Sequence, residues 1–200
     1  MNNGLVVPSF NINIALLRII PIKQIMNMKL QDFMCFLHDN KLIDLHSLLK
    51  KDEMGCINRL KLQKYVYLAQ TSLNNDFGCE YSVYNNGPYS PELANYYYEK
   101  IDPNKMSTEV NTRNWNHDIG FTKKFLSLFK DKEPEWLVIA STLIDSKNYF
   151  EDEQEILNKV YAMKSDYGRG YIDDVWNELK NKRLVEYESG LKINNILSVF

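Results

Sequence analysis

Apolar residues recur along the chain at intervals of three and four, which is the spacing of one helix face. Between residues 28 and 49 this pattern predicts a helix that breaks near 39–40, with its apolar face at Leu30, Phe33, Met34 and Leu37. A second helix is predicted from about 57 to 73. Its apolar stripe is expected at Leu62, Val66, Ala69 and Leu73, and its water-facing side at Arg59, Lys61, Gln63 and Lys64.

The middle of the chain carries turn and helix-start signals. Loose alternation over 77–84 predicts a short strand, and the sequence Asn-Asn-Gly-Pro at 85–88 predicts a turn. Ser90 is predicted to cap the next helix, because its side-chain oxygen can accept a hydrogen bond from a free backbone N–H. Pro91 suits the first helical position, where an N–H is not needed. This helix is expected to end near Ile101.

The C-terminal part predicts four helices, and the last three of them are followed by a hairpin. Helices are expected over 121–129, from Pro134 onward, after the capping residue Asp152, and over 171–183. Two short strands around a Ser-Gly turn are expected over 184–193. Three helices followed by a hairpin is the element order of a winged helix. We therefore predict a mainly α fold, α+β with few short strands, whose C-terminal segment resembles a winged helix.

The polar, Asn-rich stretch 102–118 is the predicted internal boundary. The expected organisation is an N-terminal extension or arm at 1–27, a helical module at 28–118, and a winged-helix-like segment at 119–200 packed on it. The arm is apolar over 5–26, but prolines, asparagines and an arginine interrupt it, so neither a membrane span nor a signal peptide is predicted. It is open whether it packs on the domain, binds a partner, or precedes the start codon that is used.

Composition and charge indicate which class of protein to expect. The 24 basic and 26 acidic residues give a net charge of −2, without the basic excess of a nucleic-acid-wrapping protein. Three separated cysteines indicate reduced thiols and a cytoplasmic location. Phosphate-binding, dinucleotide-binding and nucleophile-elbow motifs are absent from the sequence, and the histidines lack metal-binding spacing. We therefore expect a non-enzymatic protein without a cofactor or metal.

A DNA-binding regulator is the alternative function that the winged-helix order suggests. Its cations would be Lys180, Lys182 and Arg183, at the C-terminal end of the recognition helix. The N-terminal half of that helix carries Asp173 and Asp174, where helix-turn-helix proteins read bases. These carboxylates repel phosphate, so the charge pattern disfavours DNA binding without excluding it.

Two motifs carry a family resemblance. Lys61–Lys64 reads KLQK and is followed by Tyr67-Leu68; Gly87–Leu93 reads GPYSPEL. This pair resembles the YwgA-like proteins over roughly residues 28–188. It is similar, more distantly, to the Panacea domain of SocA-like antitoxins and of GepA-type prophage proteins, in which a KL-x-K-x-x-YL helix precedes a Tyr-x-x-Gly-Pro turn. The antitoxins more often have Gly-Pro-Val where this chain has Gly87-Pro88-Tyr89.

The resemblance implies a module that neutralises or escorts a protein partner, such as the toxin of a two-gene toxin–antitoxin pair or the product of a neighbouring gene. Tyrosines surround the Gly-Pro turn, and tyrosine is frequent in interface hot spots, although these rings could equally belong to the core. Residues expected to bind the partner are Arg59, Lys61, Lys64, Tyr84, Gly87, Pro88, Tyr89 and Ser90.

Overall fold

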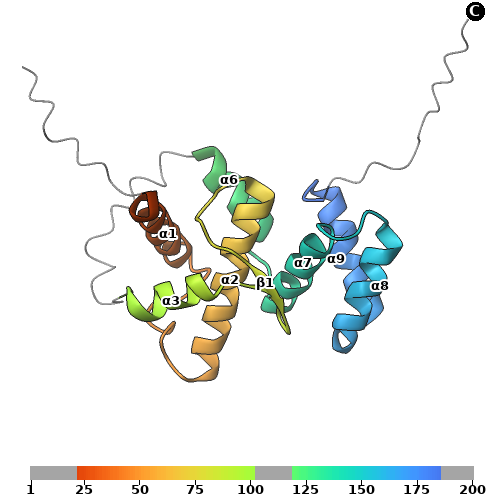
Figure 1. Ribbon diagram of the computed structural model, residues 1–200, viewed down its shortest axis with the longest axis horizontal. Helices are drawn as coiled ribbons and strands as arrows, with labels where there is room; N and C mark the ends of the chain where they lie inside the picture. The colour runs from red at the N-terminus through yellow and green to blue at the C-terminus, as the bar shows by residue number, and fades with distance from the viewer. Residues whose placement is uncertain (1–21, 102–118, 186–200) are drawn as a thin grey trace, which may run out of the picture.

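The computed structural model describes residues 22–101 and 119–185 and has a mainly α fold with one short hairpin (Figure 1), which confirms the predicted fold class. The elements before residue 102 are α1 (Ile22–Asp39), α2 (Glu53–Leu73), β1 (Ser82–Tyr84), β2 (Gly87–Tyr89) and α3 (Pro91–Glu99). Those after 118 are α6 (Ile119–Phe129), α7 (Pro134–Ser146), α8 (Glu153–Met163), a 3₁₀ turn (Ser165–Tyr167) and α9 (Arg169–Asn181).

Side-chain caps define several helix starts. Ser90 accepts a hydrogen bond from the Leu93 amide at 3.2 Å, and Asp152 accepts one from the Glu155 amide at 3.0 Å, which confirms both predicted caps. Asp52 caps α2 in the same way through the Gly55 amide at 2.8 Å. This cap lies outside the apolar stripe, so α2 begins four residues before the predicted position.

Helix α2 lies at the centre of the molecule, and the predicted water-facing side is therefore wrong for two residues. Gln63 and Lys64 are each only 2% exposed, within a run of buried residues from Leu62 to Ala69. Helices α6 and α7 and strand β2 all pack against α2, so it is enclosed on several sides (Figure 1). Hydrophobic periodicity finds the apolar face of a helix, but it cannot show that a polar face is covered by another element.

An aromatic cluster joins α6 to α1 and α2. The Phe125 ring of α6 contacts Phe33 and Phe36 of α1 and Tyr65 of α2, with ring centroids 5.2 to 5.8 Å apart. These edge-on contacts are the preferred geometry of aromatic pairs. Further buried residues continue this core without interruption as far as Val185.

Helices α7, α8 and α9 pack against one another, and α7 also contacts α2 and β2. The Glu178 carboxylate of α9 accepts hydrogen bonds from Lys132 at 2.6 Å and from the Trp136 indole at 2.8 Å, which ties α9 to the start of α7. The hairpin predicted over 184–193 falls mostly outside the described residues, and Leu184 and Val185 are not in a strand. The winged helix therefore stays a prediction.

The N-terminal boundary differs from the sequence pattern, because α1 already begins at Ile22 and thus includes the last residues assigned to the arm. Residues 1–21 lie outside the described part of the chain. Within the described ranges, none of the helices combines the length and apolar character that crossing a membrane requires.

Candidate functional site

The hairpin that follows α2 is the centre of the candidate site. Its strands pair antiparallel, with Tyr84 opposite Gly87, so that Asn85 and Asn86 form the loop. The predicted turn is confirmed in part, since Gly87 and Pro88 belong to β2. Gly87 has φ +81°, a backbone conformation that glycine adopts readily and residues with a Cβ rarely do. A Cβ on Gly87 would also lie 2.5 Å from the hydroxyl of Thr142 in α7.

Two glutamines of α2 fix the ends of the segment that contains the hairpin. Gln63 accepts from the Ser90 amide and donates to the Ser90 carbonyl, both at 2.9 Å. Gln70, two helical turns later on the same face, makes the same pair of bonds to Cys79 at 3.2 and 3.0 Å. Each side chain thereby satisfies both backbone polar groups of its partner residue, which lies outside regular secondary structure.

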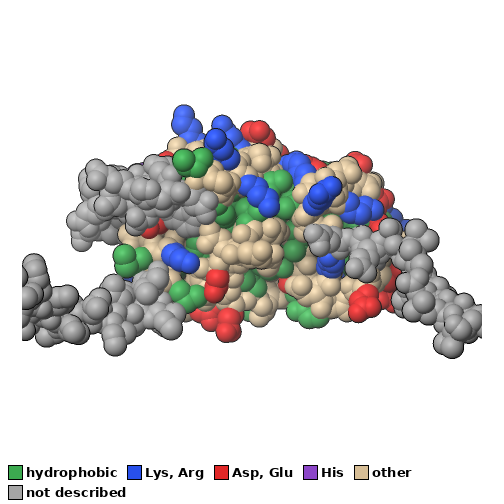
Figure 2. Space-filling model, turned by 90° about the horizontal axis from the view of Figure 1, so that it is seen from above, with side chains coloured by type: hydrophobic (Ala, Val, Ile, Leu, Met, Phe, Trp, Pro, Cys, Tyr) green, Lys and Arg blue, Asp and Glu red, His purple; other side chains and the backbone are tan. Residues whose placement is uncertain are grey.

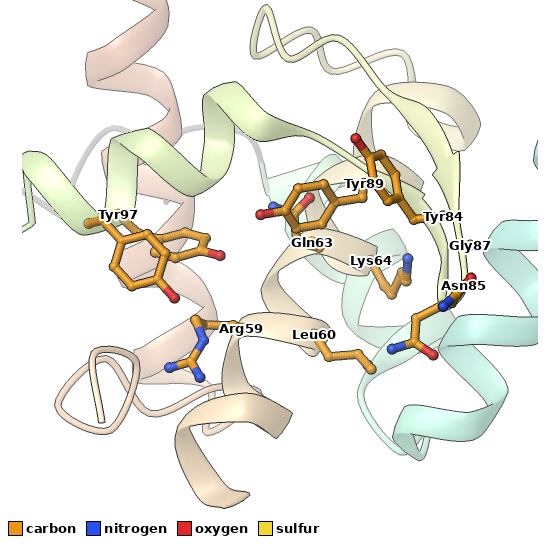
Figure 3. A pocket seen from close by; sticks show the side chains of 11 residues that line it. Arg59, Leu60, Gln63, Lys64, Tyr84, Asn85, Gly87, Tyr89 and Tyr97 are labelled. Atoms are coloured by element: carbon orange, nitrogen blue, oxygen red, sulfur yellow. The ribbon is translucent and has the colours of Figure 1, made fainter. Parts of the chain in front are cut away.

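A cavity of about 550 Å³, called here the hairpin pocket, opens between α2, the hairpin and α3 (Figure 3). Helix α2 contributes Arg59, Leu60, Gln63 and Lys64. The hairpin contributes Tyr84, Asn85, Asn86, Gly87 and Tyr89, and α3 contributes Tyr97 and Tyr98. Aromatic walls with a few polar groups are typical of binding sites, and this volume lies within their usual range.

Lys64 lies at the hairpin end of the pocket and points toward the strands (Figure 3). Its ammonium group donates to the Pro88 carbonyl at 2.5 Å. Burial lowers the pKa of Lys64 to about 7; the positive charge of Lys164 adds to this effect and the Asp145 carboxylate opposes it. Lys164, which follows α8, is also buried and donates to the Asn85 carbonyl, so two lysines from different elements hold the hairpin.

Arg59 lies at the opposite end of the pocket, near Tyr97 (Figure 3), and its guanidinium group is engaged in the fold. It donates to the carbonyls of Leu48 and Lys50, each at 2.7 Å, and so closes the loop that precedes α2. Arg59 therefore contributes positive charge to the pocket, while its substitution would also disturb this loop.

The structure brings together seven of the eight predicted partner-binding residues. Arg59, Lys64, Tyr84, Gly87 and Tyr89 line the pocket, and Pro88 and Ser90 are the backbone partners of Lys64 and Gln63. Lys61 does not line it; its ammonium group lies 5.9 Å from the centre of the Tyr65 ring instead. Lys64 and Ser90 are buried, so neither lies on the outer surface of the protein; of the two, Lys64 lines the pocket.

The sequence analysis missed several residues that support the pocket but lie outside the two motifs. Gln70 and Lys164 hold the hairpin segment, and Tyr67 donates to the buried Asp145 carboxylate at 3.2 Å. Thr142 sets how closely β2 approaches α7. No local pattern indicates these hydrogen bonds, because their partners lie 9 to 79 positions apart in the chain.

The cations assigned to DNA binding are largely engaged with carboxylates. Lys180 pairs with Glu153 at 2.7 Å, and Lys182 pairs with Glu178 at 2.6 Å. Arg183 has a left-handed backbone, φ 53°, at the end of α9. On the face drawn in Figure 2, the described Lys and Arg side chains are interspersed with apolar and uncharged ones. Both observations weaken the alternative, since DNA affinity depends on cations free to meet phosphates.

Two histidines of the described residues, His38 and His46, lie close to each other. Helix α1 ends one residue after His38, so His38 and His46 do not share a helix, although their ring centroids are 5.6 Å apart. In the described part of the chain, no three His, Cys, Asp or Glu side chains converge as metal ligands would.

Comparison of the chain with protein-family models, curated proteins and solved structures finds no match.

Proposed function

We propose that the protein is a non-enzymatic, cytoplasmic protein-binding module, antitoxin-like in its action, that holds a segment of a partner protein in the hairpin pocket. The observation that carries this proposal is the arrangement of exposed aromatic side chains at the pocket. Tyr84 of the hairpin and Tyr98 of α3 both line the pocket and are each 55% exposed, and Val83 beside Tyr84 is 43% exposed. Exposed rings on a rigid frame are the usual anchors of protein interfaces.

The frame supports the same function. The glutamine bonds to Ser90 and Cys79 and the lysine bonds to Pro88 and Asn85 fix the backbone of the segment that carries Tyr84. A preformed surface loses less conformational entropy on binding than a mobile one. The resemblance of the KLQK and GPYSPEL motifs to YwgA-like and Panacea proteins, some of which are antitoxins, suggests a toxin or a neighbouring gene product as the partner.

Co-expression tests this function. Each gene adjacent to this one is expressed alone and together with the chain, and growth is measured. We expect one neighbour to be toxic alone and harmless beside the wild-type chain, and to co-purify with it. The double variant Tyr84→Ala, Tyr98→Ala should lose rescue and co-purification. Tyr149→Ala is the matched control, since Tyr149 is 70% exposed and does not line the pocket.

Two results would contradict the proposal. The antitoxin role fails if no neighbour is toxic. The use of the hairpin pocket fails if the double variant, folded like the wild type by circular dichroism, still rescues growth and retains the partner.

A further inference from the structure

The hairpin pocket carries a charge pattern that the exposed tyrosines do not explain. Among the described residues that line it, two are cationic, Arg59 and Lys64, and none is acidic. Lys164 adds a third positive charge close enough to lower the pKa of Lys64, and the Asp145 carboxylate is the acidic group that acts on Lys64. The pocket and its surroundings therefore have an excess of positive charge in a protein whose net charge is −2.

The lysine is enclosed, and its hydrogen-bond partner is neutral. Lys64 is 2% exposed, and its ammonium group donates to the Pro88 carbonyl, which carries no formal charge. Burying an ammonium group costs free energy unless an opposite charge compensates it. An anion that enters the pocket would supply that compensation, in surroundings where charges interact more strongly than in water.

The other lining groups suit a carboxylate on a peptide. Asn85 and Asn86 are exposed and offer side-chain amide donors, and the tyrosines offer hydroxyl donors beside apolar ring faces. Carboxylates accept several such bonds at once, and hydrogen bonds to a charged group are roughly twice as strong as neutral ones. Because aromatic rings border the pocket, an acidic side chain flanked by apolar residues fits it better than a free inorganic anion.

We propose that the hairpin pocket receives an Asp or Glu side chain of the partner's docking segment, beside Lys64 and the Asn85–Asn86 loop. This inference rests on the proposed function, because it specifies the chemistry of the segment held there. It assigns the tyrosines to apolar contact and the lysine to recognition of the acidic residue.

A peptide selection tests it without knowledge of the partner. A library of random 12-residue peptides displayed on phage is selected against the full chain. Phage that bind the wild type are kept only if they do not bind the double variant Tyr84→Ala, Tyr98→Ala. We expect the retained peptides to share one acidic position next to apolar residues. A synthetic peptide from this set should bind about tenfold more weakly when its shared Glu or Asp is replaced by Gln or Asn.

Two variants of the protein separate recognition from folding. Asn86→Asp places a negative charge in the exposed hairpin loop without changing the core. It should weaken binding of the acidic peptide about tenfold and leave binding of the Gln or Asn version of the peptide unchanged. Lys64→Met should do the same if its melting temperature stays near that of the wild type. Lys123→Met, at an exposed site outside the pocket, is the control.

The pH dependence gives a further readout. The charged or titratable groups near Lys64 are Lys164, Asp145 on α7, and tyrosines of α2 and the hairpin, while Arg59 lies at the opposite end of the pocket. With its pKa near 7, Lys64 loses its charge above neutral pH, so the acidic peptide should bind more weakly at pH 8.5 than at pH 6 by about tenfold, and its Gln or Asn version should not.

The outcomes distinguish the two proposals. Peptides that need the tyrosines but share no acidic residue would overturn the carboxylate site and leave the protein-binding function standing. The same holds if an acidic peptide binds equally to the wild type, Asn86→Asp and Lys64→Met. If no peptide depends on Tyr84 and Tyr98, the pocket is not a peptide-binding surface and both proposals fall.

Discussion

Lys64 is buried, whereas lysine side chains are normally exposed to solvent. An unfolded lysine titrates near pH 10.4, whereas burial lowers the pKa of Lys64 in the folded protein to about 7. Between these values the unfolded state binds more protons than the folded state, so the contribution of Lys64 to stability rises with pH. Deprotonation relieves the cost of its burial only in the folded chain.

The Lys64→Met variant isolates this contribution. Its free energy of unfolding is compared with that of the wild type by urea denaturation from about pH 7 to about pH 9, below the pKa of about 10 of unfolded tyrosines. We expect the wild type to gain stability relative to Lys64→Met across this range. The comparison with Lys123→Met should stay constant, because Lys123 is exposed. Parallel curves for Lys64→Met and the wild type would show that Lys64 keeps an ordinary pKa.

At the scale of elements, the contact between β2 and α7 depends on a residue without a side chain. Gly87 combines a left-handed backbone with the close approach of the Thr142 hydroxyl, and α7 in turn packs on α2. Alanine at this position would be strained in the backbone and would clash with Thr142.

Gly87→Ala is therefore expected to lower the free energy of unfolding by about 2 kcal/mol or more. The matched control is Gly170→Ala, since Gly170 lies in the first turn of α9 with open space around it. That substitution should be neutral or stabilising by up to about 1 kcal/mol. Urea denaturation of both variants measures the difference, and equal effects at the two glycines would show that β2 does not depend on this close approach.

Features that depend on neighbouring residues could be predicted from the sequence, and contacts between distant residues could not. The caps Ser90 and Asp152 were predictable because a cap needs only the residues of the first turn. The side-chain bonds of Gln63 to Ser90 span 27 positions, so periodicity assigned Gln63 to solvent. The predicted partner-binding residues include five of the eleven residues that line the pocket. Lys164 approaches Asn85 across 79 positions, and no local pattern indicated it.

At the scale of the whole molecule, the described helices share one hydrophobic core. It runs from Leu30 of α1 through α2 and α7 to α9, so the two predicted segments bury apolar surface against each other. A continuous core is expected to unfold as one cooperative unit in a chain of this size.

Two spectroscopic probes test this cooperativity. In a Trp115→Phe background, fluorescence reports Trp136 and Trp176 in the α7–α9 part, and far-ultraviolet circular dichroism reports all helices. Phe125→Ala in α6 should lower the free energy of unfolding by about 3 to 5 kcal/mol, because Phe125 belongs to the same core. Both urea transitions should therefore move together to lower urea concentration. A fluorescence transition that stays at its original midpoint would instead indicate two independent units.

The two glutamines of α2 have a consequence for how such a module can diversify. Gln70 holds Cys79 and Gln63 holds Ser90, so both ends of the segment between these residues are fixed to the central helix. Lengthening a loop between fixed ends costs little entropy, about 0.6 kcal/mol for each doubling. The exposed loop at Asn85 and Asn86 could therefore vary in length and sequence while Gly87 keeps β2 against α7, and such variation would redirect the protein to a new partner without changing the helices beneath.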